Sequence, residues 1–495
     1  MPDAPDAAGV PAPADRDWSL LIGGKLVSTR SGRCYDDVSP ATEQVIAHVP
    51  DGDAADVDAA VQAAERAATE WRRVPPRERG ARVAELARVL EEHADELAFL
   101  DAIDGGHPVT SMHLDVSMGA DMLRLFSGLG IELKGETIPA TTENLHLTLR
   151  EPFGVVGRII PFNHPIMFAA GKIAAPLVAG NAVILKPPES APLSALRMGE
   201  LFADLLPPGV LSIVVGDGPA AGRAIARHPA IRRIGFIGSD RTGRSIQKDA
   251  AEVGVKEVTL ELGGKNALIA FPDADPEQVA ASAVAGMNFV RSSGQSCGST
   301  SRLLLHESIA DDVVGRVLAR MAAIRIGDPL DPATEMGTMA SRAQYDKTMR
   351  YIDMARADGA TVLAGGGPPP NLPGQPGLFI APTLLGGVRP DMRVAREEVF
   401  GPVLSVIRWQ DEQAAIDIAN AVDYGLTGSI WTSDLTRAHR VAGAIQAGYL
   451  WINGSARHFA GVPFGGVKMS GVGREESLGE LLSYTQLKTV NIMLG

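Results

Sequence analysis

A strand–turn–helix pattern repeats through the middle of the chain and restricts the fold more than any other feature. Apolar runs that end in turns and precede amphipathic segments predict four strands, at residues 155–160, 182–185, 211–215 and 234–237. Strands that alternate with helices form a doubly wound, mostly parallel sheet. The sequence therefore predicts an α/β protein with a Rossmann-like doubly wound domain in this region.

Polar side chains follow the ends of these strands. Asn163, Lys186, Glu189 and Ser239 each come just after a predicted strand. Because ligands of doubly wound sheets bind beyond the carboxyl ends of the strands, we expect these residues to converge on one ligand site.

A second αβ region follows a pair of glycines. Apolar and polar residues alternate from Val258 to Leu262, which predicts a strand whose Glu261 side chain faces away from the apolar side. Gly263-Gly264 comes next, and we expect a domain boundary there. The second region extends to about residue 465, with strands expected near 267–271, 302–306, 403–407, 428–432 and 449–452.

The remaining segments have their own character. Residues 1–17 are acidic and rich in Pro and Ala, which predicts a disordered tail. The next segment predicts three helices, near 53–71, from about 83 to 105, and over 109–129. Residues 131–151 contain leucines that alternate with polar residues, which predicts a half-buried strand in a protruding hairpin. Oligomer contacts commonly cover the free edges of such a hairpin.

Composition and charge exclude several classes of protein. A chain of 495 residues is too long for one core, so two to four domains are expected. The formal net charge of −13 argues against a nucleic-acid or anionic-membrane partner. Residues 154–185 are the most apolar, but Arg158 and Lys172 interrupt them too strongly for a membrane span. The 10 histidines show no zinc-like spacing, so no metal site is expected.

The chain has only two cysteines, Cys34 and Cys297. Cys297 lies between Gly294 and Gly298 among small polar residues, where glycine lets another molecule approach the backbone. Such a thiol can be a nucleophile if its pKa is lowered, although this stretch alone leaves a small core filler as an alternative. We interpret Cys34, outside every motif, as structural. Two cysteines build no disulfide framework and no secretory signal is visible, so we expect a cytoplasmic protein.

Seven short motifs carry a resemblance to one family. They are PFNHP (161–165), KPPE (186–189), FIGS with Gly243 (236–243), ELGGK (261–265), GQSC (294–297), EEVFGPV (397–403) and PFGGVKMSGVGRE (463–475). From about residue 20 to its end, the chain resembles the NAD(P)-dependent aldehyde dehydrogenases. Two positions depart from the family's usual residues, Phe162 in place of Trp and Ile237 in place of Thr. Both bear on cofactor affinity more than on the chemistry.

The resemblance implies three catalytic residues, and their chemistry is coherent. A thiolate at Cys297 attacks the aldehyde carbonyl to give a thiohemiacetal. The Asn163 amide and the Cys297 backbone N–H stabilise the oxyanion. Loss of hydride to a nicotinamide leaves a thioester, and Glu261 activates the water that hydrolyses it. The expected reaction is NAD-dependent oxidation of an aldehyde to a carboxylic acid.

The cofactor site is expected at the strand ends. Lys186 and Glu189 are placed to bind the adenine ribose, and the carboxylate would repel a 2′-phosphate, which favours NAD over NADP. Ser239 begins a helix that can bind the pyrophosphate.

Gly216-Asp217-Gly218 lacks the dinucleotide-binding spacing and is interpreted as a turn. By resemblance, Glu398 holds the nicotinamide ribose and Phe400 packs near the ring. The full expected set is Ile160, Pro161, Phe162, Lys186, Glu189, Gly222, Phe236, Gly238, Ser239, Leu262, Gly263, Glu398 and Phe400.

The resemblance also predicts a substrate pocket and a domain plan. The pocket residues would be Met122, Phe126, His164, Met167, Ser296, His458 and Phe459, and together with Met118 and Phe289 they suggest tolerance of apolar or aromatic aldehydes. The NAD-binding domain would span 18–130 and 152–262, and the catalytic domain 263–465. The hairpin 131–151 and the strand 480–495 would form a small β element that joins subunits into a homodimer or homotetramer.

Three other functions remain as alternatives. A CoA-acylating enzyme could share the fold, although Glu261 would then be wasteful as a base for water. A cysteine hydrolase could pair Cys297 with His164 or His306, but it leaves the cofactor residues unexplained. A non-catalytic structural protein would have lost Cys297, Asn163 or Glu261, and all of them are present.

Overall fold

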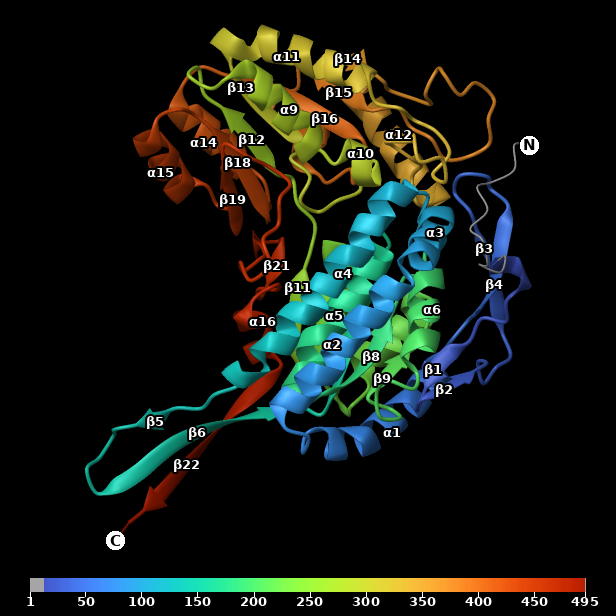
Figure 1. Cartoon of the computed structure of the whole chain (residues 1–495). Coiled ribbons are helices and arrows are strands. Elements are labelled where there is room, and N and C mark those ends of the chain that lie inside the picture. The colour runs from blue at the N-terminus through green and yellow to red at the C-terminus, as the bar shows by residue number, and fades with distance from the viewer. Residues whose placement is uncertain (1–12, 495) are drawn as a thin grey trace.

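The chain forms two β-sheets and an extended β arm (Figure 1). The computed structural model describes residues 13–494. In the first sheet the strand order is β2-β1-β9-β8-β7-β10-β11-β21, and the run from β9 to β11 is parallel. This confirms the predicted Rossmann-like, doubly wound α/β class. The strands are β1 (Leu20–Ile22), β2 (Lys25–Val27), β7 (Val155–Ile159), β8 (Ala182–Lys186), β9 (Leu211–Ile213), β10 (Ile231–Ile237), β11 (Glu257–Glu261) and β21 (Gly471–Val472).

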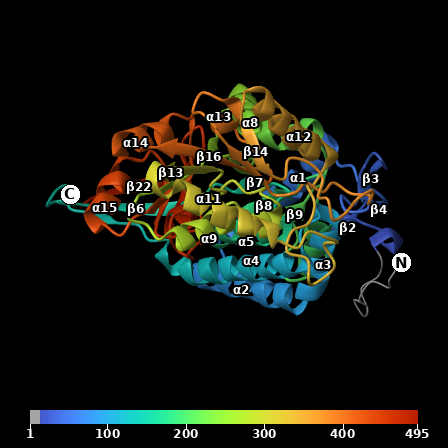
Figure 2. The ribbon, with the colours of Figure 1, turned by 90° about the horizontal axis from the view of Figure 1, so that it is seen from above.

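Helices cover both faces of the first sheet (Figures 1 and 2). On one face are α2 (Pro76–Glu92), α3 (Ala94–Gly105), α4 (Val109–Leu129), α5 (Pro165–Ala179) and α6 (Leu193–Phe202), and on the other are α1 (Ala54–Trp71), α7 (Arg223–Arg227) and α8 (Asp240–Val253). The single helix predicted from about 83 to 105 is wrong. His93 leaves the helical conformation (φ −110°, ψ 22°), which divides the segment into α2 and α3.

The second sheet has the order β14-β15-β16-β13-β12-β18-β19, and only its edge strand β14 is antiparallel. Its strands are β12 (Ala267–Ala270), β13 (Arg302–His306), β14 (Thr361–Ala364), β15 (Thr383–Gly386), β16 (Val403–Trp409), β18 (Thr427–Trp431) and β19 (Tyr449–Ile452). The surrounding helices are α9 (Pro276–Gly286), α10 (Phe289–Ser292), α11 (Glu307–Ala322), α12 (Arg342–Ala357), α13 (Arg393–Arg396), α14 (Glu412–Asn420) and α15 (Leu435–Ala444).

The chain passes between the two sheets at the Gly263-Gly264 pair and later returns. β11 belongs to the first sheet and β12 to the second, while β21 pairs with β11 through Leu260 and Val472. A short ribbon of β17 (Tyr424–Gly425) and β20 (Val467–Lys468) and the helix α16 (Leu478–Ser483) lie along the return path. The division of labour into a cofactor domain and a catalytic domain stays a prediction.

The arm projects from the body of the molecule (Figure 1). It consists of β5 (Thr137–Ile138), β6 (Asn144–Pro152) and β22 (Thr485–Met493) in the order β22-β6-β5. β6 and β22 pair antiparallel without a register shift, from Thr485 opposite Pro152 to Met493 opposite Asn144. The predicted strand is therefore present, but within one chain Leu145 and Leu149 are exposed.

Two sequence interpretations at the N-terminal end are corrected. The predicted disordered tail falls largely on residues 1–12, outside the described residues, but residues 13–17 are packed. Pro13 is buried in the 3-10 turn η1 (Pro13–Asp15), and Arg16 forms ion pairs with Glu96 (2.9 Å) and Glu200 (2.7 Å). Cys34 is exposed on the hairpin of β3 (Cys34–Val38) and β4 (Val45–Pro50), so it is not a core filler.

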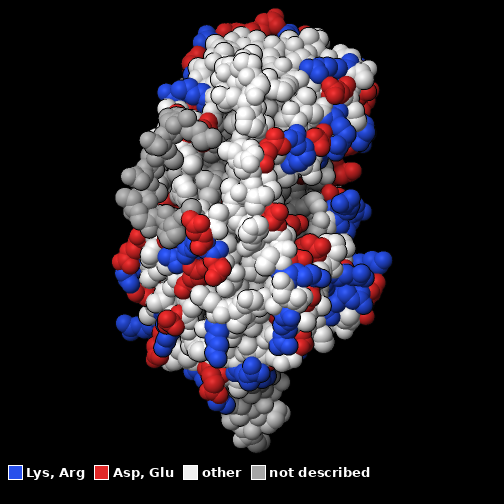
Figure 3. Space-filling view, turned by 90° about the vertical axis from the view of Figure 1, so that its right-hand side faces the viewer, with Lys and Arg blue, Asp and Glu red and all other residues white. Residues whose placement is uncertain are grey.

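Charges of both signs are interspersed on the face shown in Figure 3. No helix within residues 13–494 is both long enough and apolar enough to cross a membrane.

Candidate active site

Two cavities meet where the carboxyl edge of the first sheet faces the amino edge of the second. The larger, of about 750 Å³, is called the Met118 cavity here, and the other, of about 580 Å³, the Glu398 cavity. Their shared wall consists of Asn163, Phe168, Ile237, Glu261 and Cys297. All three predicted catalytic side chains therefore lie at the junction of two spaces, one on each side of the thiol.

The loop that carries Cys297 is held in one conformation. Gly294 has a φ of +72°, and a Cβ there would lie 2.6 Å from the carbonyl carbon of Gly401, so only glycine fits. The Asn266 side chain donates a hydrogen bond to the Cys297 carbonyl oxygen (2.7 Å), and Gln295 accepts one from the Ala340 N–H (3.1 Å). These contacts hold the loop so that Cys297 lines both cavities.

The environment of Cys297 raises the pKa of its thiol to about 12, mainly through burial and then through the nearby Glu261 carboxyl. The sequence left open whether the pKa of this thiol is lowered, and burial raises it instead. The main charges that act on it come from carboxylates, so the protonated thiol is favoured at neutral pH. Removing its proton is therefore part of the chemistry at this site.

Asn163 follows β7 and comes directly before α5. Its side chain is buried, borders both cavities and makes no hydrogen bond within residues 13–494. The residue at the N-cap of α5 is His164, so a helix-capping role for Asn163 is not observed. The amide is free to donate to an oxygen atom placed next to Cys297.

Glu261 is the last residue of β11, and it too is buried without a partner. Neither carboxyl oxygen has a hydrogen-bond partner in the described part of the chain. Burial, followed by the charge of Glu475, raises the pKa of Glu261 well above its usual value. The side chain lies against Gly465, where a Cβ would come within 2.6 Å of Glu261 Oε1. The result is a carboxylate with a high affinity for a proton, facing the thiol's cavities.

A second buried carboxyl group in the Met118 cavity, that of Glu475, has a lowered pKa, in contrast to Glu261. Glu475 contacts Arg158 Nη1 at 2.9 Å and Lys172 Nζ at 2.7 Å, and these cations lower its pKa to about 2. Glu475 therefore stays charged, whereas Glu261 can take up a proton. Neighbouring carboxyl groups whose pKa values are driven apart are typical of acid–base sites.

The Glu398 cavity has the features of a site for a flat, extended ligand. The Gly264 N–H donates to Glu398 Oε1 (2.8 Å), and a Cβ at Gly263 would lie 2.2 Å from Glu398 Oε2. Phe162 and Phe400 form an edge-to-face pair with ring centroids 5.8 Å apart. The glycines thus keep open a space whose walls are aromatic on one side and carry an acidic group on the other.

Comparison with known proteins identifies the family of the chain. The sequence profile described as "Aldehyde dehydrogenase family" matches residues 26–490. The chain belongs to the aldehyde dehydrogenase family. Aldehyde dehydrogenase tropH of Talaromyces stipitatus is 46% identical over 483 residues, which cover 96% of this chain and 93% of that protein.

Two solved structures are similar over nearly their whole length. An aldehyde dehydrogenase from Bacillus cereus, solved as an NAD+ complex, superposes with a TM-score of 0.94 at 36% identity and covers 98% of each chain. PnpE from Pseudomonas sp. WBC-3 superposes with a TM-score of 0.93 at 40% identity, over 97% of this chain and 98% of that one. As a member of this family, the protein is an enzyme that oxidises aldehydes.

Most predicted cofactor residues of this aldehyde dehydrogenase lie together. Eight of them line the Glu398 cavity: Pro161, Phe162, Gly238, Ser239, Leu262, Gly263, Glu398 and Phe400. Lys186 and Glu189 form an ion pair at 3.2 Å, and a Cβ at Gly222 would lie 3.8 Å from the Lys186 side chain, so these three form a separate group. Ile160 and Phe236 are buried in the core and line neither cavity, so their side chains do not reach a ligand there.

The predicted substrate residues divide into two groups. His164, Met167, Ser296 and His458 line the Met118 cavity, and Met122 lines a space next to it. Phe126 is only 1% exposed, in the core one turn beyond the part of α4 that reaches the cavity, and Phe459 is 49% exposed against Arg457. Neither lines the cavity, and Phe289 is also a core residue. These assignments are therefore corrected.

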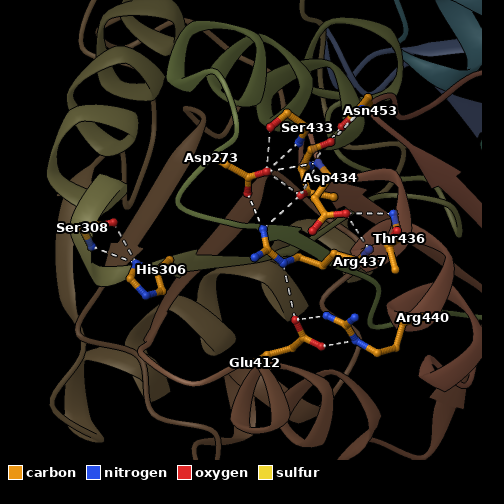
Figure 4. Close-up of polar contacts among 11 residues, drawn as sticks. Asp273, His306, Ser308, Glu412, Ser433, Asp434, Thr436, Arg437, Arg440 and Asn453 are labelled. Atoms are coloured by element: carbon orange, nitrogen blue, oxygen red, sulfur yellow. Dashed lines mark hydrogen bonds and ion pairs between the residues drawn. The ribbon is translucent and has the colours of Figure 1, made fainter.

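Of the two histidines that a cysteine hydrolase could pair with Cys297, the structure places only His164 near the thiol. His306 caps α11 at the opposite edge of the second sheet, where its Nδ1 lies 2.8 Å from Ser308 Oγ (Figure 4). It lines neither cavity that contains Cys297. His164 does line the Met118 cavity, but its Nδ1 is engaged by the buried Asp115 at 2.6 Å.

Sequence reasoning missed several residues at the site. Gln344 and Lys347 line the Glu398 cavity, and Lys172, Arg291, Trp451, Phe464 and Glu476 line the Met118 cavity. Lys172 gave a usable signal, because it is the only charged residue in the otherwise apolar helix α5. Arg291 was visible six residues before Cys297, but nothing in the sequence paired it with a partner on α4.

Proposed function

We propose that this aldehyde dehydrogenase oxidises its substrate to a carboxylic acid with NAD, through a covalent intermediate on Cys297. The observation that supports it most is the junction of the two cavities. There, the thiol lies between two buried side chains, Asn163 and Glu261, whose polar atoms have no protein partner within residues 13–494. Buried polar groups without partners cost stability, so their retention at one point favours a catalytic role.

In the first step the deprotonated sulfur of Cys297 attacks the aldehyde carbon, and a C–S bond forms as the carbonyl oxygen becomes an oxyanion. The Asn163 amide and the Cys297 backbone N–H are the donors for that oxyanion. One such donor contributes about 3 kcal/mol to transition-state stabilisation in comparable sites. Asn163 lies in the bend before α5 and Cys297 in a loop held by the Asn266 side chain, so this loop needs little reorganisation.

The residues of the Glu398 cavity fit a dinucleotide. The glycines at 238 and 263 keep the space open, Ser239 starts α8 beside it, and Glu398 offers an acceptor for a ribose hydroxyl. When bound there, NAD supplies the acceptor for the hydride that leaves the substrate carbon. The related Bacillus cereus enzyme was solved as an NAD+ complex, which supports the same cofactor for this chain.

Glu261 is proposed as the base for the second half of the reaction. A thioester on Cys297 must be hydrolysed by water, and the raised pKa of Glu261 makes its carboxylate a stronger base than an ordinary glutamate. Because the side chain borders both cavities, it can act on a water molecule from the same side as the thioester. This role favours hydrolysis over transfer of the acyl group to another thiol.

The preference for NAD over NADP is attributed to Glu189. Its side chain is 55% exposed and is tethered by the buried Lys186 at 3.2 Å. A 2′-phosphate on the adenine ribose would add negative charge beside this carboxylate and be repelled. We therefore expect NADP to be the poorer cofactor.

The arm is proposed to join subunits into a homodimer or homotetramer. The strands β6 and β22 expose five apolar side chains, Leu145, Leu149, Leu487, Ile492 and Met493. By register and alternation, Leu145, Leu149 and Ile492 share one face of the arm. Apolar side chains exposed on one face commonly mark contact sites between proteins. A working thiol at Cys297 also favours the reducing cytoplasm as the compartment.

A panel of aldehydes tests the proposal directly. The purified protein should convert aldehydes to acids with one NADH formed per acid, as measured by NADH absorbance and product chromatography, and NADP should replace NAD poorly. If no aldehyde of the panel produced NADH, or if the protein failed to bind NAD in calorimetry, the proposed function would be wrong.

A further inference from the structure

A buried carboxylate on α4 orients two side chains at the wall of the Met118 cavity. Asp115 Oδ1 accepts a hydrogen bond from Arg291 Nη2 (2.7 Å), and Asp115 Oδ2 lies 2.6 Å from His164 Nδ1. The Asp115 side chain is 0% exposed, and it does not line the cavity itself. Both of its oxygens are occupied, so the cavity is lined by the Arg291 and His164 side chains while the carboxylate lies behind them.

Arg291 keeps hydrogen-bond donors without an acceptor. Its Nε is buried and has no partner in the described part of the chain, and no hydrogen bond engages Nη1 there. The side chain is nevertheless 30% exposed and lines the cavity. The guanidinium is thus fixed through Nη2, and Nη1 remains as a donor that can form a charge-assisted hydrogen bond with a carboxylate in the cavity.

The other cationic groups of the cavity are neutralised at its surface. Lys172 is held by Glu475 at 2.7 Å, and His458 Nδ1 lies 3.2 Å from Glu476. Both glutamates line the cavity themselves. An anionic group on a ligand would therefore be repelled on that side, and among the cationic side chains of the cavity within residues 13–494 Arg291 is the one that keeps a donor without an acceptor.

Between these polar groups the cavity is apolar. Met118, Met167, Phe168, Trp451 and Phe464 form its walls. Thioether and aromatic side chains pack well against flat rings and unsaturated chains. The ligand that fits these features has an apolar body, an aldehyde that reaches Cys297 and an oxygen anion at its other end.

We propose that Arg291, oriented by Asp115, is a specificity residue that binds a carboxylate on the substrate remote from its aldehyde group. The substrate class is thus an aldehyde that also carries a carboxylate, on an aromatic or similarly flat, apolar body. His164 lines the same cavity and is held by the same carboxylate. This inference rests on the proposed function, and it replaces the sequence-based expectation of a pocket for simple apolar aldehydes.

A matched pair of substrates tests the class in the unmodified enzyme. Para-carboxybenzaldehyde and para-methylbenzaldehyde have similar size and differ in charge. With NAD, kcat/KM should be about 10- to 100-fold higher for the carboxylated aldehyde, which is the range expected for charge-assisted hydrogen bonds. Equal or better turnover of the methyl compound overturns the inference while leaving the proposed function intact. Failure of both aldehydes, together with the rest of the panel, would overturn the proposed function as well.

Variants of Arg291 then assign the preference to this residue. Arg291→Met removes the donors and keeps the length, and it should reduce the ratio of kcat/KM values for the pair by about 30-fold, mainly through a higher KM for the carboxylated aldehyde. Arg291→Lys should lose less. Arg316→Met is the matched control, because Arg316 is paired with Glu277 on the surface at 2.6 Å, and its ratio should equal that of the unmodified enzyme. An equal loss for both aldehydes would indicate a merely structural role for Arg291.

A binding measurement separates recognition from turnover. In the Cys297→Ala protein, which retains the cavity and cannot form the covalent intermediate, calorimetry should show tighter binding of para-carboxybenzaldehyde than of para-methylbenzaldehyde, and Arg291→Met in that background should abolish the difference. If both ligands bind with the same affinity before the Arg291 change, the carboxylate site does not exist. This arm also decides the matter if the single Arg291 variants fold poorly, because the comparison begins with the intact Arg291.

Discussion

The carboxyl edges of the two sheets carry similar residue types, yet of these two edges only the first borders the cavities that meet at Cys297. At the first edge, Asn163 follows β7 and Glu261 is the last residue of β11. Both side chains are buried and have no hydrogen-bond partner within residues 13–494. At the second edge, Asp273 follows β12 and lies beside Ser433, just beyond the end of β18 (Figure 4). Both positions conform to the rule that ligands of such sheets bind beyond the strand ends.

The second edge is closed by its own hydrogen bonds. Asp273 Oδ2 accepts from the Ser433 hydroxyl (2.7 Å), the Ser433 N–H (2.9 Å) and the Thr432 hydroxyl (2.8 Å), while Arg437 Nη1 donates to Oδ1 (2.7 Å) (Figure 4). Although burial opposes this, these bonds lower the pKa of Asp273 to about 2. The carboxylate is thus satisfied by the protein and has little capacity left for a ligand.

The comparison teaches that position at a strand end is not enough to identify a site. Hydrogen bonding distinguishes the two edges. At the first edge, the Asn163 amide and the Glu261 carboxyl are buried beside a cavity without a protein partner within residues 13–494. The pKa of Glu261 is raised there, which disfavours its charged form. The polar atoms at the second edge are bonded to their neighbours and stabilise charge. Substitutions at the two edges should therefore have opposite consequences for activity and stability.

The largest effect is expected from Cys297→Ala, which removes the proposed nucleophile from the loop that faces the first edge. Steady-state NADH formation should fall by at least about 10⁴-fold, because no other group can form the covalent intermediate. The melting temperature should change little, and NAD should still bind in calorimetry. Activity within tenfold of the unmodified enzyme would remove the first edge from the chemistry.

Glu261→Gln is expected to stop the reaction halfway. Without the base, hydrolysis of the thioester should slow by about 10²- to 10⁴-fold, while the first turnover of NADH still appears as a burst. Rapid-mixing absorbance gives the burst, and intact-protein mass spectrometry should detect the acyl group on the protein. A variant that lost the burst together with the steady state would show that Glu261 also removes the thiol proton.

The pH profile should distinguish the two edges without any substitution. The pKa of the Cys297 thiol is raised to about 12 and that of Glu261 is raised as well, and both groups react in their deprotonated forms. Activity should therefore increase as pH rises through the neutral range, and kcat/KM at saturating NAD is the measurement. A flat profile between weakly acidic and weakly alkaline pH would contradict the environment described for these groups.

At the second edge, Asp273→Asn should reduce stability and leave catalysis alone. Because the folded pKa of about 2 lies below the ordinary 3.8, the carboxylate stabilises the protein above that ordinary value and loses this contribution as pH falls toward 2. The substitution should cost about 2 kcal/mol at neutral pH, measured by denaturant unfolding. Its kcat/KM should stay within about twofold of the unmodified value, since the site is remote. A large loss of activity would make the second edge functional after all.

The smallest effect is expected at the rim of the first edge. Glu189→Gln removes the charge proposed to repel a 2′-phosphate, and it should reduce the preference for NAD over NADP by about tenfold. The ratio of kcat/KM values for the two cofactors is the readout, and Glu200→Gln, on a neighbouring helix, is a matched control. An unchanged ratio would assign the cofactor preference to another residue.

The polar residues at strand ends could be predicted from the sequence, because strands and turns are visible in short stretches of it. The strand ends that carry Asn163, Glu261 and Ser239 could be predicted because alternation and turns are local, and the structure brings these residues to one edge. The pairing of Lys172 with Glu475 could not be predicted, since the two residues are 303 positions apart and meet only in the folded chain.

The errors have a common physical cause. Phe126 and Met122 share one face of α4, but the cavity extends only part of the way along that helix, so the more distant side chain is in the core. The direction of the thiol pKa shift could not be predicted, because it depends on burial and on carboxylates from other segments, which residue spacing does not reveal. His93 interrupts a helix although the apolar periodicity continues across it.

The arm joins two segments that are far apart in the sequence. β6 and β22 pair over nine residue pairs, from Thr485 opposite Pro152 to Met493 opposite Asn144, so the paired residues are more than 300 positions apart. Because the entropy of closing so long a loop is lost before the contacts form, pairings of this kind form slowly. We therefore expect the arm to be among the last parts of the fold to form, and β6 keeps a free edge until β22 reaches it.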